Sequence, residues 1–181
     1  LQDSDREFAI QTLLLEDTGV KIKFGTSGWR GRIGEDFIDA NVVRAVEGVA
    51  VYYKEHINKG MILISFDPRR GNQHLAKLAA SVLAAHGIPA RIIVQAPAPT
   101  PVLAYLAQSD ENITGVINFT ASHNPAIDDG LKFSPYHGGA ADKTITEAIS
   151  HYANQATSYK YMEYDIAKEQ GFITELPLEE A

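Results

Sequence analysis

Residues 114–135 read TGVINFTASHNPAIDDGLKFSP, and this stretch decides the fold. Its first part, residues 114–119, is β-prone and predicts a strand. A polar excursion follows, and the β-prone residues 131–134 bring the chain back. Asp129-Gly130 is a strong turn signal. We therefore predict two antiparallel strands joined by a loop, because the connection is too short for a crossover.

The loop between these strands carries reactive side chains. The hydroxyl of Ser122 and the imidazole of His123 stand beside Asn124-Pro125, and a following proline keeps Asn124 out of the helical region. Lys132 returns an ammonium group to the same end of the return strand. We predict that these three groups lie near the mouth of the loop. The arrangement suits a serine that carries a transferable group beside a cation and a proton carrier.

Buried strands and amphipathic helices alternate before the loop. Residues 61–66 and 90–94 are apolar runs typical of buried strands, whereas residues 39–57 and 75–83 carry apolar side chains at helical spacing. Asp142 begins a last helix. This order predicts right-handed crossovers and an α/β fold with a mixed, mostly parallel sheet.

The two ends of the chain differ from this central pattern. We interpret residues 1–19 as an N-terminal helical extension, in which residues 4–16 form the helix. Residues 20–156 form the α/β domain, beginning with a strand at residues 20–24. Residues 157–181 are polar and end in acidic side chains, and we predict a linker or a loosely docked tail that leads toward an absent second domain.

The composition excludes several classes of function. The chain has 181 residues, 45% of them hydrophobic, which is ample for a core, and we predict no membrane span. A net charge of −7 argues against nucleic acid as a partner. With 0 cysteines there is neither a disulfide nor a thiolate nucleophile, and together with the lack of a signal peptide this favours a cytoplasmic protein.

The segment between Val20 and Gly34 contains lysine and arginine but no acidic residue, which suits a small anionic ligand. Within it, Thr26 and Ser27 offer hydroxyl groups, and the guanidinium of Arg30 suits phosphate oxygens. Ligands gather beyond the carboxyl ends of strands in open α/β sheets. Three loops are predicted to meet there: residues 25–31, 67–72 and 120–130.

Several of these segments resemble motifs of the α-D-phosphohexomutases, which include phosphoglucomutase and phosphomannomutase. Residues 24–31, FGTSGWRG, resemble the opening motif of that family, and residues 120–125, TASHNP, resemble its phosphoserine loop. Residues 130–132 and 97–101 are similar to two further family segments. The resemblance covers residues 20–155 and implies a three-layer α/β/α domain, the first of four in the family.

The resemblance implies a role for each reactive side chain. Ser122 would transfer a phosphoryl group to a hexose phosphate, and the bisphosphorylated sugar would reorient and return its other phosphoryl group. Lys132 would be the general base toward the sugar hydroxyl, and His123 would position groups or share proton transfer. Arg30 would neutralise charge on the phosphoryl oxygens. The residues expected to bind phosphate or substrate are Thr26, Ser27, Arg30, Asn124 and Lys132.

The resemblance also implies Mg²⁺, held in part by the phosphate on Ser122, and an activator of the glucose 1,6-bisphosphate type. The Asp-x-Asp-x-Asp-Arg run that supplies the other magnesium ligands belongs to a second domain, and only residues 3–6, DSDR, partly resemble it. We interpret those residues as helix-start chemistry. We therefore expect the chain to need the remaining domains of the same polypeptide and to be inactive as a mutase alone.

Two other functions remain open from the sequence. A serine hydrolase normally has its nucleophile in a Gly-x-Ser-x-Gly elbow, but Ala121 and His123 flank Ser122. A non-catalytic sugar-phosphate-binding module of the same fold has no need of the hydroxyl. The segment Asp67-Pro68-Arg69-Arg70 departs from the more common Asp-x-Arg, which leaves open the arginine that matters.

Overall fold

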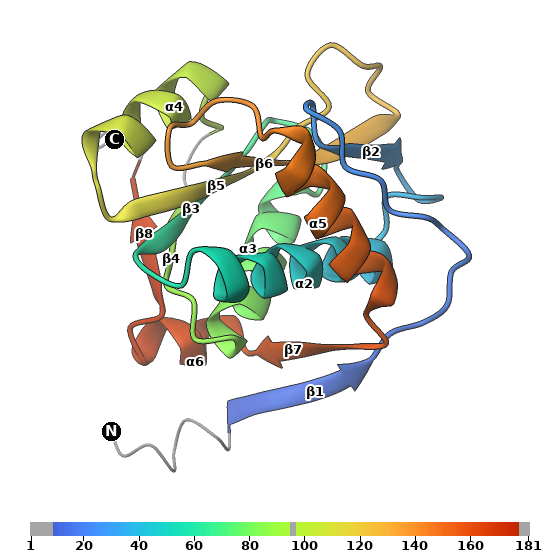
Figure 1. Cartoon of the computed structure of the whole chain (residues 1–181), viewed down its shortest axis with the longest axis horizontal. Coiled ribbons are helices and arrows are strands. Elements are labelled where there is room, and N and C mark those ends of the chain that lie inside the picture. Colours follow the sequence, from blue (N-terminus) through green and yellow to red (C-terminus); the bar gives the residue numbers. More distant parts are fainter. Residues whose placement is uncertain (1–8, 95–96, 178–181) are drawn as a thin grey trace.

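In a computed structural model that describes residues 9–94 and 97–177, six strands form a central sheet (Figure 1). In spatial order they are β2 (Trp29–Arg32), β6 (Asp128–Pro135), β5 (Ile113–Phe119), β3 (Met61–Phe66), β4 (Ala90–Ile93) and β8 (Ile173–Leu176). Strands β5, β3, β4 and β8 run parallel, whereas β6 is antiparallel to both β5 and β2. The predicted mixed, mostly parallel sheet is confirmed.

Helices cover both faces of this sheet and make three layers. Helices α2 (Asp39–His56), α3 (Asn72–Ala85) and α5 (Lys143–Gln155) pack over the larger core, and α4 (Thr100–Ser109) packs over a smaller one. Strand β3 serves both, because Ile64 lies in the larger core and Leu63 in the smaller. The predicted three-layer α/β/α arrangement is confirmed.

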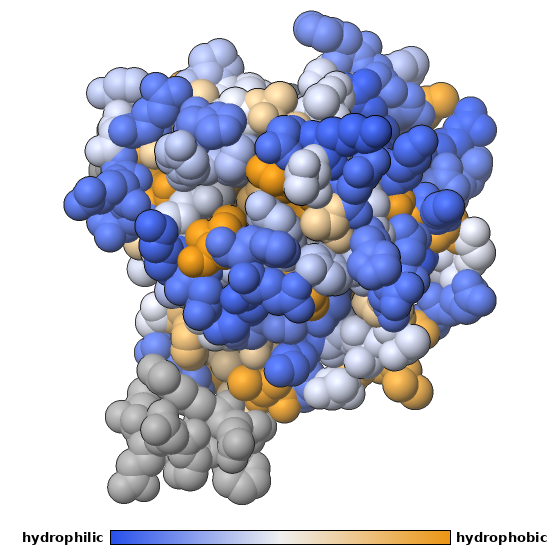
Figure 2. Space-filling view, in the orientation of Figure 1, coloured by the Kyte–Doolittle hydropathy of each residue, from blue (hydrophilic) through white to orange (hydrophobic). Residues whose placement is uncertain are grey.

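Side-chain periodicity explains why the outer helices form. Helix α2 buries Val42, Val46 and Val49 at helical spacing, as predicted. Asp142 accepts a hydrogen bond from the backbone nitrogen of Ile145 at 2.9 Å and caps α5. The face turned toward the reader in Figure 2 is mainly hydrophilic, with separate hydrophobic spots. The helices therefore bury one face and expose the other to water.

The prediction of a helix over residues 4–16 is wrong where the structure describes it. Residues 1–8 lie outside the described part, and Ile10–Leu14 is a strand, β1. It pairs antiparallel with β7 (Ser158–Met162) as a separate two-stranded ribbon. Pairing with a segment far along the chain supplies backbone hydrogen bonds that outweigh a weak local helical preference.

Residues 158–176 also correct the sequence analysis, because they are neither a linker nor a loosely docked tail. After β7 they form helix α6 (Tyr164–Glu169) and strand β8, which extends the main sheet by pairing parallel with β4. Ile173 and Ala167 are buried in the larger core. These two apolar side chains stand in a polar sequence, so their burial was not visible as a periodic pattern.

The strand predicted at residues 20–24 is absent, although its alternation is real. Ile22 and Phe24 are buried while their lysine neighbours are exposed. Their backbone groups bond to side chains of α5 instead of a strand. The nitrogen and oxygen of Ile22 bond to Asn154, and the nitrogen of Phe24 bonds to Ser150. Burial of every second side chain therefore indicates an extended backbone, but it does not show that the segment pairs with a strand.

Two expectations about the site loops are also corrected. The loop predicted at residues 25–31 overlaps β2, which begins at Trp29, and Asp129-Gly130 lies inside β6 and not in a turn. A Cβ atom on Gly130 would stand 2.7 Å from the carbonyl oxygen of Thr120 and 3.0 Å from that of Trp29. Gly130 is needed because neighbouring strands approach it closely, which a sequence pattern cannot separate from a turn.

Candidate functional site

Ser122 lies on an exposed loop just beyond the carboxyl end of β5. Its backbone has a φ of 54°, a left-handed conformation that is strained for a non-glycine residue. The backbone nitrogen of Ser122 donates to the hydroxyl of Thr120 at 3.0 Å, which helps to hold this conformation. Strain of this kind costs about 1–3 kcal/mol and is typical of functional positions. The fold thus holds the Ser122 hydroxyl outside the core.

Arg69 holds the loop in place from the connection between β3 and α3. Its backbone nitrogen and Nε both donate to the carboxylate of Asp67 at 3.0 Å, which orients the guanidinium. The four remaining N–H groups reach backbone carbonyl oxygens of the loop: Ser122 (3.1 Å), Asn124 (3.0 Å), Pro125 (2.8 Å) and Asp128 (2.9 Å). One rigid five-donor group therefore sets the loop conformation.

A buried polar cluster supports Arg69 from below. The amide nitrogen of Asn72 donates to Asp67 at 2.9 Å, to the carbonyl oxygen of Phe119 at 3.1 Å and to Asp129 at 3.3 Å. Asp129 is 1% exposed, and burial raises the pKa of its carboxyl to about 6. A hydrogen bond from the nitrogen of Gly130 acts in the opposite direction on this pKa. The carboxyl end of the sheet thus contains a titratable group beneath the serine loop.

Arg30 reaches the loop from the other side. It sits on β2 opposite Gly130 of β6, and its Nη1 donates to Oδ1 of Asn124 at 2.8 Å. A Cβ on Gly130 would stand 3.1 Å from the Cγ of Arg30, so the glycine gives the arginine room. Asn124 also donates to Asp128 at 3.0 Å. The structure therefore brings Arg30 into contact with Asn124, which lies two positions after Ser122 in the sequence.

Lys132 and His123 provide the remaining groups of the predicted site. Lys132 lies on β6 opposite Asn118 of β5 and is half-buried. His123 is exposed on the loop. Within residues 9–94 and 97–177, the side chains of Ser122, His123 and Lys132 form no hydrogen bond or ion pair. These three groups are consequently available to a ligand.

Thr26 and Ser27 lie in a different setting. They are the exposed central residues of a tight turn closed by reciprocal bonds between Gly25 and Gly28, at 3.0 and 2.9 Å. Thr26 borders a hollow between residues 21–26 and α5, away from the residues that line the depression beside Ser122. Their role in phosphate binding stays a prediction.

An open depression of about 690 Å³ adjoins the serine. A cavity of this volume accommodates a small organic ligand. Besides Ser122 it is lined by Asp67, Pro68, Arg69, Arg70, Thr120, Asn124 and Ala126. Arg70 is exposed here, whereas Arg69 turns inward to the loop. Arg69 is therefore the arginine that holds the loop, and Arg70 is the arginine that is exposed to a ligand in the depression.

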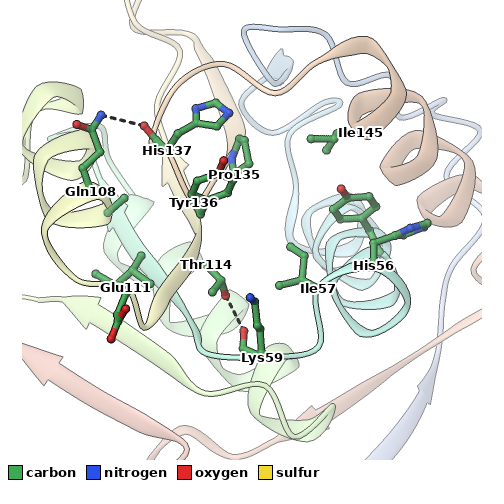
Figure 3. Close-up of a pocket in the computed structure, with 13 residues that line it drawn as sticks. His56, Ile57, Lys59, Gln108, Glu111, Thr114, Pro135, Tyr136, His137 and Ile145 are labelled. Carbon is green, nitrogen blue, oxygen red and sulfur yellow. Dashed lines mark hydrogen bonds between the residues drawn. The ribbon is translucent and has the colours of Figure 1, made fainter.

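A third hollow, of about 660 Å³, lies at the opposite end of the sheet (Figure 3). Its apolar lining includes Ile57 and Ile145, and the Thr114 hydroxyl donates to the carbonyl oxygen of Lys59 at 2.7 Å. No serine lines it. A volume comparable to that beside Ser122 is thus lined without a serine hydroxyl.

The described residues offer no complete cation site. In residues 9–94 and 97–177 no group of three or more His, Asp or Glu side chains is arranged to hold a metal ion. The set of ligands expected for Mg²⁺ is therefore incomplete within this part of the chain. Among the helices that the structure describes, none combines the length and the apolar character needed to cross a membrane.

Sequence reasoning missed the residues that hold the loop, namely Arg69, Asn72 and Asp129. The segment at residues 67–70 attracted attention, but two adjacent arginines gave no basis for choosing between them. Asn72 is the first residue of α3, and nothing in the sequence indicates that its side chain turns into the sheet. Only the packing of α3 against the carboxyl ends of β3 and β5 makes these contacts.

The fold and loop together define an α/β/α domain that presents a strained, exposed serine beside cationic groups. Residues 21–160 match the family model of phosphoglucomutase/phosphomannomutase, alpha/beta/alpha domain I. The chain therefore belongs to the phosphoglucomutase/phosphomannomutase family, and it contains domain I of that family.

Two relatives show the extent of the sequence similarity. The chain is 36% identical over 132 residues to the phosphoglucosamine mutase of Aliarcobacter butzleri, covering 72% of this chain and 29% of that protein. It is 33% identical over 148 residues to the phosphoglucomutase of Komagataeibacter xylinus, covering 77% of this chain and 26% of that protein. The chain thus spans less than a third of the length of these mutases.

Solved structures confirm the fold. A putative phosphomannomutase from Thermus thermophilus superposes with a TM-score of 0.76 at 27% identity, covering 88% of this chain and 34% of that one. The phosphoglucomutase parafusin from Paramecium, in an open form, gives a TM-score of 0.75 at 23% identity over 88% of this chain and 30% of that one. Both neighbours support the three-layer domain described above.

Proposed function

We propose that Ser122 is the phosphoryl carrier of a mutase that interconverts hexose 1-phosphate and hexose 6-phosphate through a bisphosphorylated sugar. The observation that carries this proposal is the exposed hydroxyl at a strained backbone position, on a loop that Arg69 holds and Arg30 flanks. Membership of a mutase family supports the same reaction.

In the forward transfer, the bond between phosphorus and Oγ of Ser122 breaks and a bond to a sugar hydroxyl oxygen forms. Lys132 takes the proton of that hydroxyl while Oγ of Ser122 gains a proton as it leaves, and in the return transfer Oγ gives that proton up as it attacks the second phosphoryl group. Arg30 neutralises charge on the transferred group, with His123 positioning it or sharing the proton. Thr26, Ser27 and Asn124 are the further phosphate contacts of this proposal.

Mg²⁺ would be held by the phosphate on Ser122 and by carboxylates of another domain, where it would neutralise charge on the phosphoryl oxygens. Because the described residues lack a complete donor set, this chain alone is proposed to accept a phosphoryl group but not to turn over a hexose phosphate. A glucose 1,6-bisphosphate-type activator would load the serine, and the remaining domains of the polypeptide would supply sugar recognition.

The test is loading of the purified chain with glucose 1,6-bisphosphate in the presence of Mg²⁺, followed by mass spectrometry. We expect one added phosphoryl group on Ser122 in the wild type and none in Ser122→Ala. Ser109→Ala is the matched control, since Ser109 is also exposed but lies at the end of α4. A phosphoryl group that persists in Ser122→Ala refutes the proposal.

Two outcomes would identify the alternatives. Tight binding of the bisphosphate without any labelling of Ser122 would identify a non-catalytic sugar-phosphate-binding module. Covalent labelling of Ser122 by a fluorophosphonate, with no phosphoryl loading, would favour a hydrolase. A coupled glucose 1-phosphate assay completes the set, and robust turnover by this chain would contradict its proposed dependence on further domains.

A further inference from the structure

Three polar residues form a row across neighbouring strands on the sheet face that carries α4. The strand registers pair Ser65 of β3 with Asn118 of β5, and Asn118 with Lys132 of β6. Side chains alternate between the two faces of a sheet. The neighbours Ile117 and Phe133 lie in the larger core on the other face, so the three polar side chains share the α4 face.

Two members of this row are buried without a partner. Ser65 is 0% exposed and Asn118 is 5% exposed. In the part of the chain that the structure describes, neither Oγ of Ser65 nor Oδ1 of Asn118 accepts or donates a hydrogen bond. A buried polar atom left unpaired is destabilising and is uncommon in folded proteins. Asn118 Oδ1 therefore needs a donor.

Lys132 is one of the two donors, with Ser65, that the strand registers place directly opposite Asn118. Directly opposed residues of an antiparallel pair have Cβ atoms about 4.5–5.5 Å apart, and a lysine side chain carries three donors on a flexible stem. Lys132 is half-buried and has no hydrogen bond or ion pair among the described residues. The flexible four-carbon stem of a lysine allows Nζ to reach a directly opposed side chain.

We infer that Asn118 is a positioning residue whose Oδ1 accepts a hydrogen bond from Nζ of Lys132. Asn118 lies near the carboxyl end of β5, and the loop with Ser122 follows directly after this strand. The bond therefore fixes the position of the lysine relative to the serine. The catalytic meaning of this bond rests on the proposed function, in which Lys132 is the general base. The bond itself is independent of that function.

Two substitutions separate a positioning role from a packing role, because the two roles predict opposite orders of tolerance for the two replacements. Asn118→Leu has a similar volume and removes the unpaired oxygen, so a residue that only fills space would tolerate it well. Asn118→Asp keeps an acceptor at the same position but places a carboxylate in a buried site. A positioning residue should tolerate Asp in its effect on Lys132 and should not tolerate Leu.

The experiment observes the ammonium groups of ¹⁵N-lysine-labelled chain by NMR at low temperature and mildly acidic pH. Lys132→Arg assigns the Lys132 signal, and the exposed Lys143 is the internal control. We expect slow hydrogen exchange at Lys132 in the wild type and in Asn118→Asp, and at least tenfold faster exchange in Asn118→Leu. Exchange at Lys143 should stay the same in all three proteins.

Equal exchange at Lys132 in the wild type and Asn118→Leu would overturn the inference, as would fast exchange in Asn118→Asp with a folded spectrum. The rate of Ser122 loading by the bisphosphate is the second readout. It should fall at least tenfold in Asn118→Leu, within the range that general acid–base groups contribute, and recover in Asn118→Asp. If Ser122 is never loaded, the proposed function fails while the exchange result still decides the hydrogen bond.

Discussion

The two ends of the central sheet carry hollows of similar volume but different chemistry. At the carboxyl end, beside Ser122, side chains bond to loop carbonyl groups and leave a hydroxyl, an imidazole and an ammonium group without partners among the described residues. At the amino end, the hydroxyl of Thr114 bonds to the carbonyl oxygen of Lys59 (Figure 3), and the hydroxyl of Tyr53 bonds to the same oxygen. The comparison teaches that the arrangement of reactive groups, not the volume, locates the site.

Removal of the Arg69 guanidinium should have the largest effect on the carboxyl end. In Arg69→Met four loop carbonyl groups lose their donor and Asp67 loses its ion-pair partner. We expect the free energy of unfolding to fall by about 3 kcal/mol and loading of Ser122 to be lost. Urea denaturation and mass spectrometry measure the two effects.

The control is Arg70→Met, since Arg70 is exposed and makes no hydrogen bond with the described residues. Its free energy of unfolding should change by no more than about 0.5 kcal/mol. Equal destabilisation by the two substitutions would show that the inward arginine does not hold the loop.

The buried carboxyl of Asp129 should make stability depend on pH. Because its pKa is raised in the folded state, its contribution is complete below the ordinary value of 3.8 and is lost as the pH rises through about 6. Asn keeps the acceptor and carries no charge. At pH 7 we expect Asp129→Asn to raise the free energy of unfolding by about 2–3 kcal/mol and to flatten its decline across this window.

Urea denaturation from acidic to neutral pH tests this expectation. Asp36→Asn is the control, because Asp36 is exposed, and it should shift the free energy of unfolding by about 0.5 kcal/mol at most. A decline across this pH window that is as steep in Asp129→Asn as in the wild type would contradict the assignment.

A matched pair of glycines compares the two ends directly. A Cβ on Gly130 would meet two backbone carbonyl oxygens, and a Cβ on Gly60 would stand 2.4 Å from the carbonyl oxygen of Asn112, at a φ of 71°. We expect each alanine substitution to cost about 2 kcal/mol of stability. Only Gly130→Ala should also slow the loading of Ser122, measured by mass spectrometry under conditions where both variants are folded. Slower loading of Ser122 in Gly60→Ala would contradict the view that only the carboxyl end of the sheet shapes the site.

The smallest effect is expected at the amino end. Lys59→Met removes an exposed ammonium group from the hollow of Figure 3 and leaves the carbonyl oxygen that closes the turn. We expect a change of at most about 0.5 kcal/mol in stability and an unchanged rate of Ser122 loading. A large loss of loading would show that this hollow takes part in the reaction.

Local patterns predicted the helices and buried strands of residues 39–94 and 114–155 well. Apolar runs and helical spacing report burial, and burial dominates the stability of these elements. The same rules were wrong for Ile10–Leu14, which a distant strand pairs, and for Ile173–Leu176, whose polar sequence hides a sheet strand. Both elements exist because of partners that no local window contains.

The sequence by itself determined the α/β class, the serine loop and the family resemblance, because periodicity and motifs are local properties of the chain. Tertiary structure alone decided that Arg69 and not Arg70 holds the loop, and that Asn72 and Asp129 lie beneath it. It also placed Asn118 opposite Lys132. Hydrogen bonds between residues about 50 positions apart form only when strands come into register, and register depends on the packing of the whole sheet.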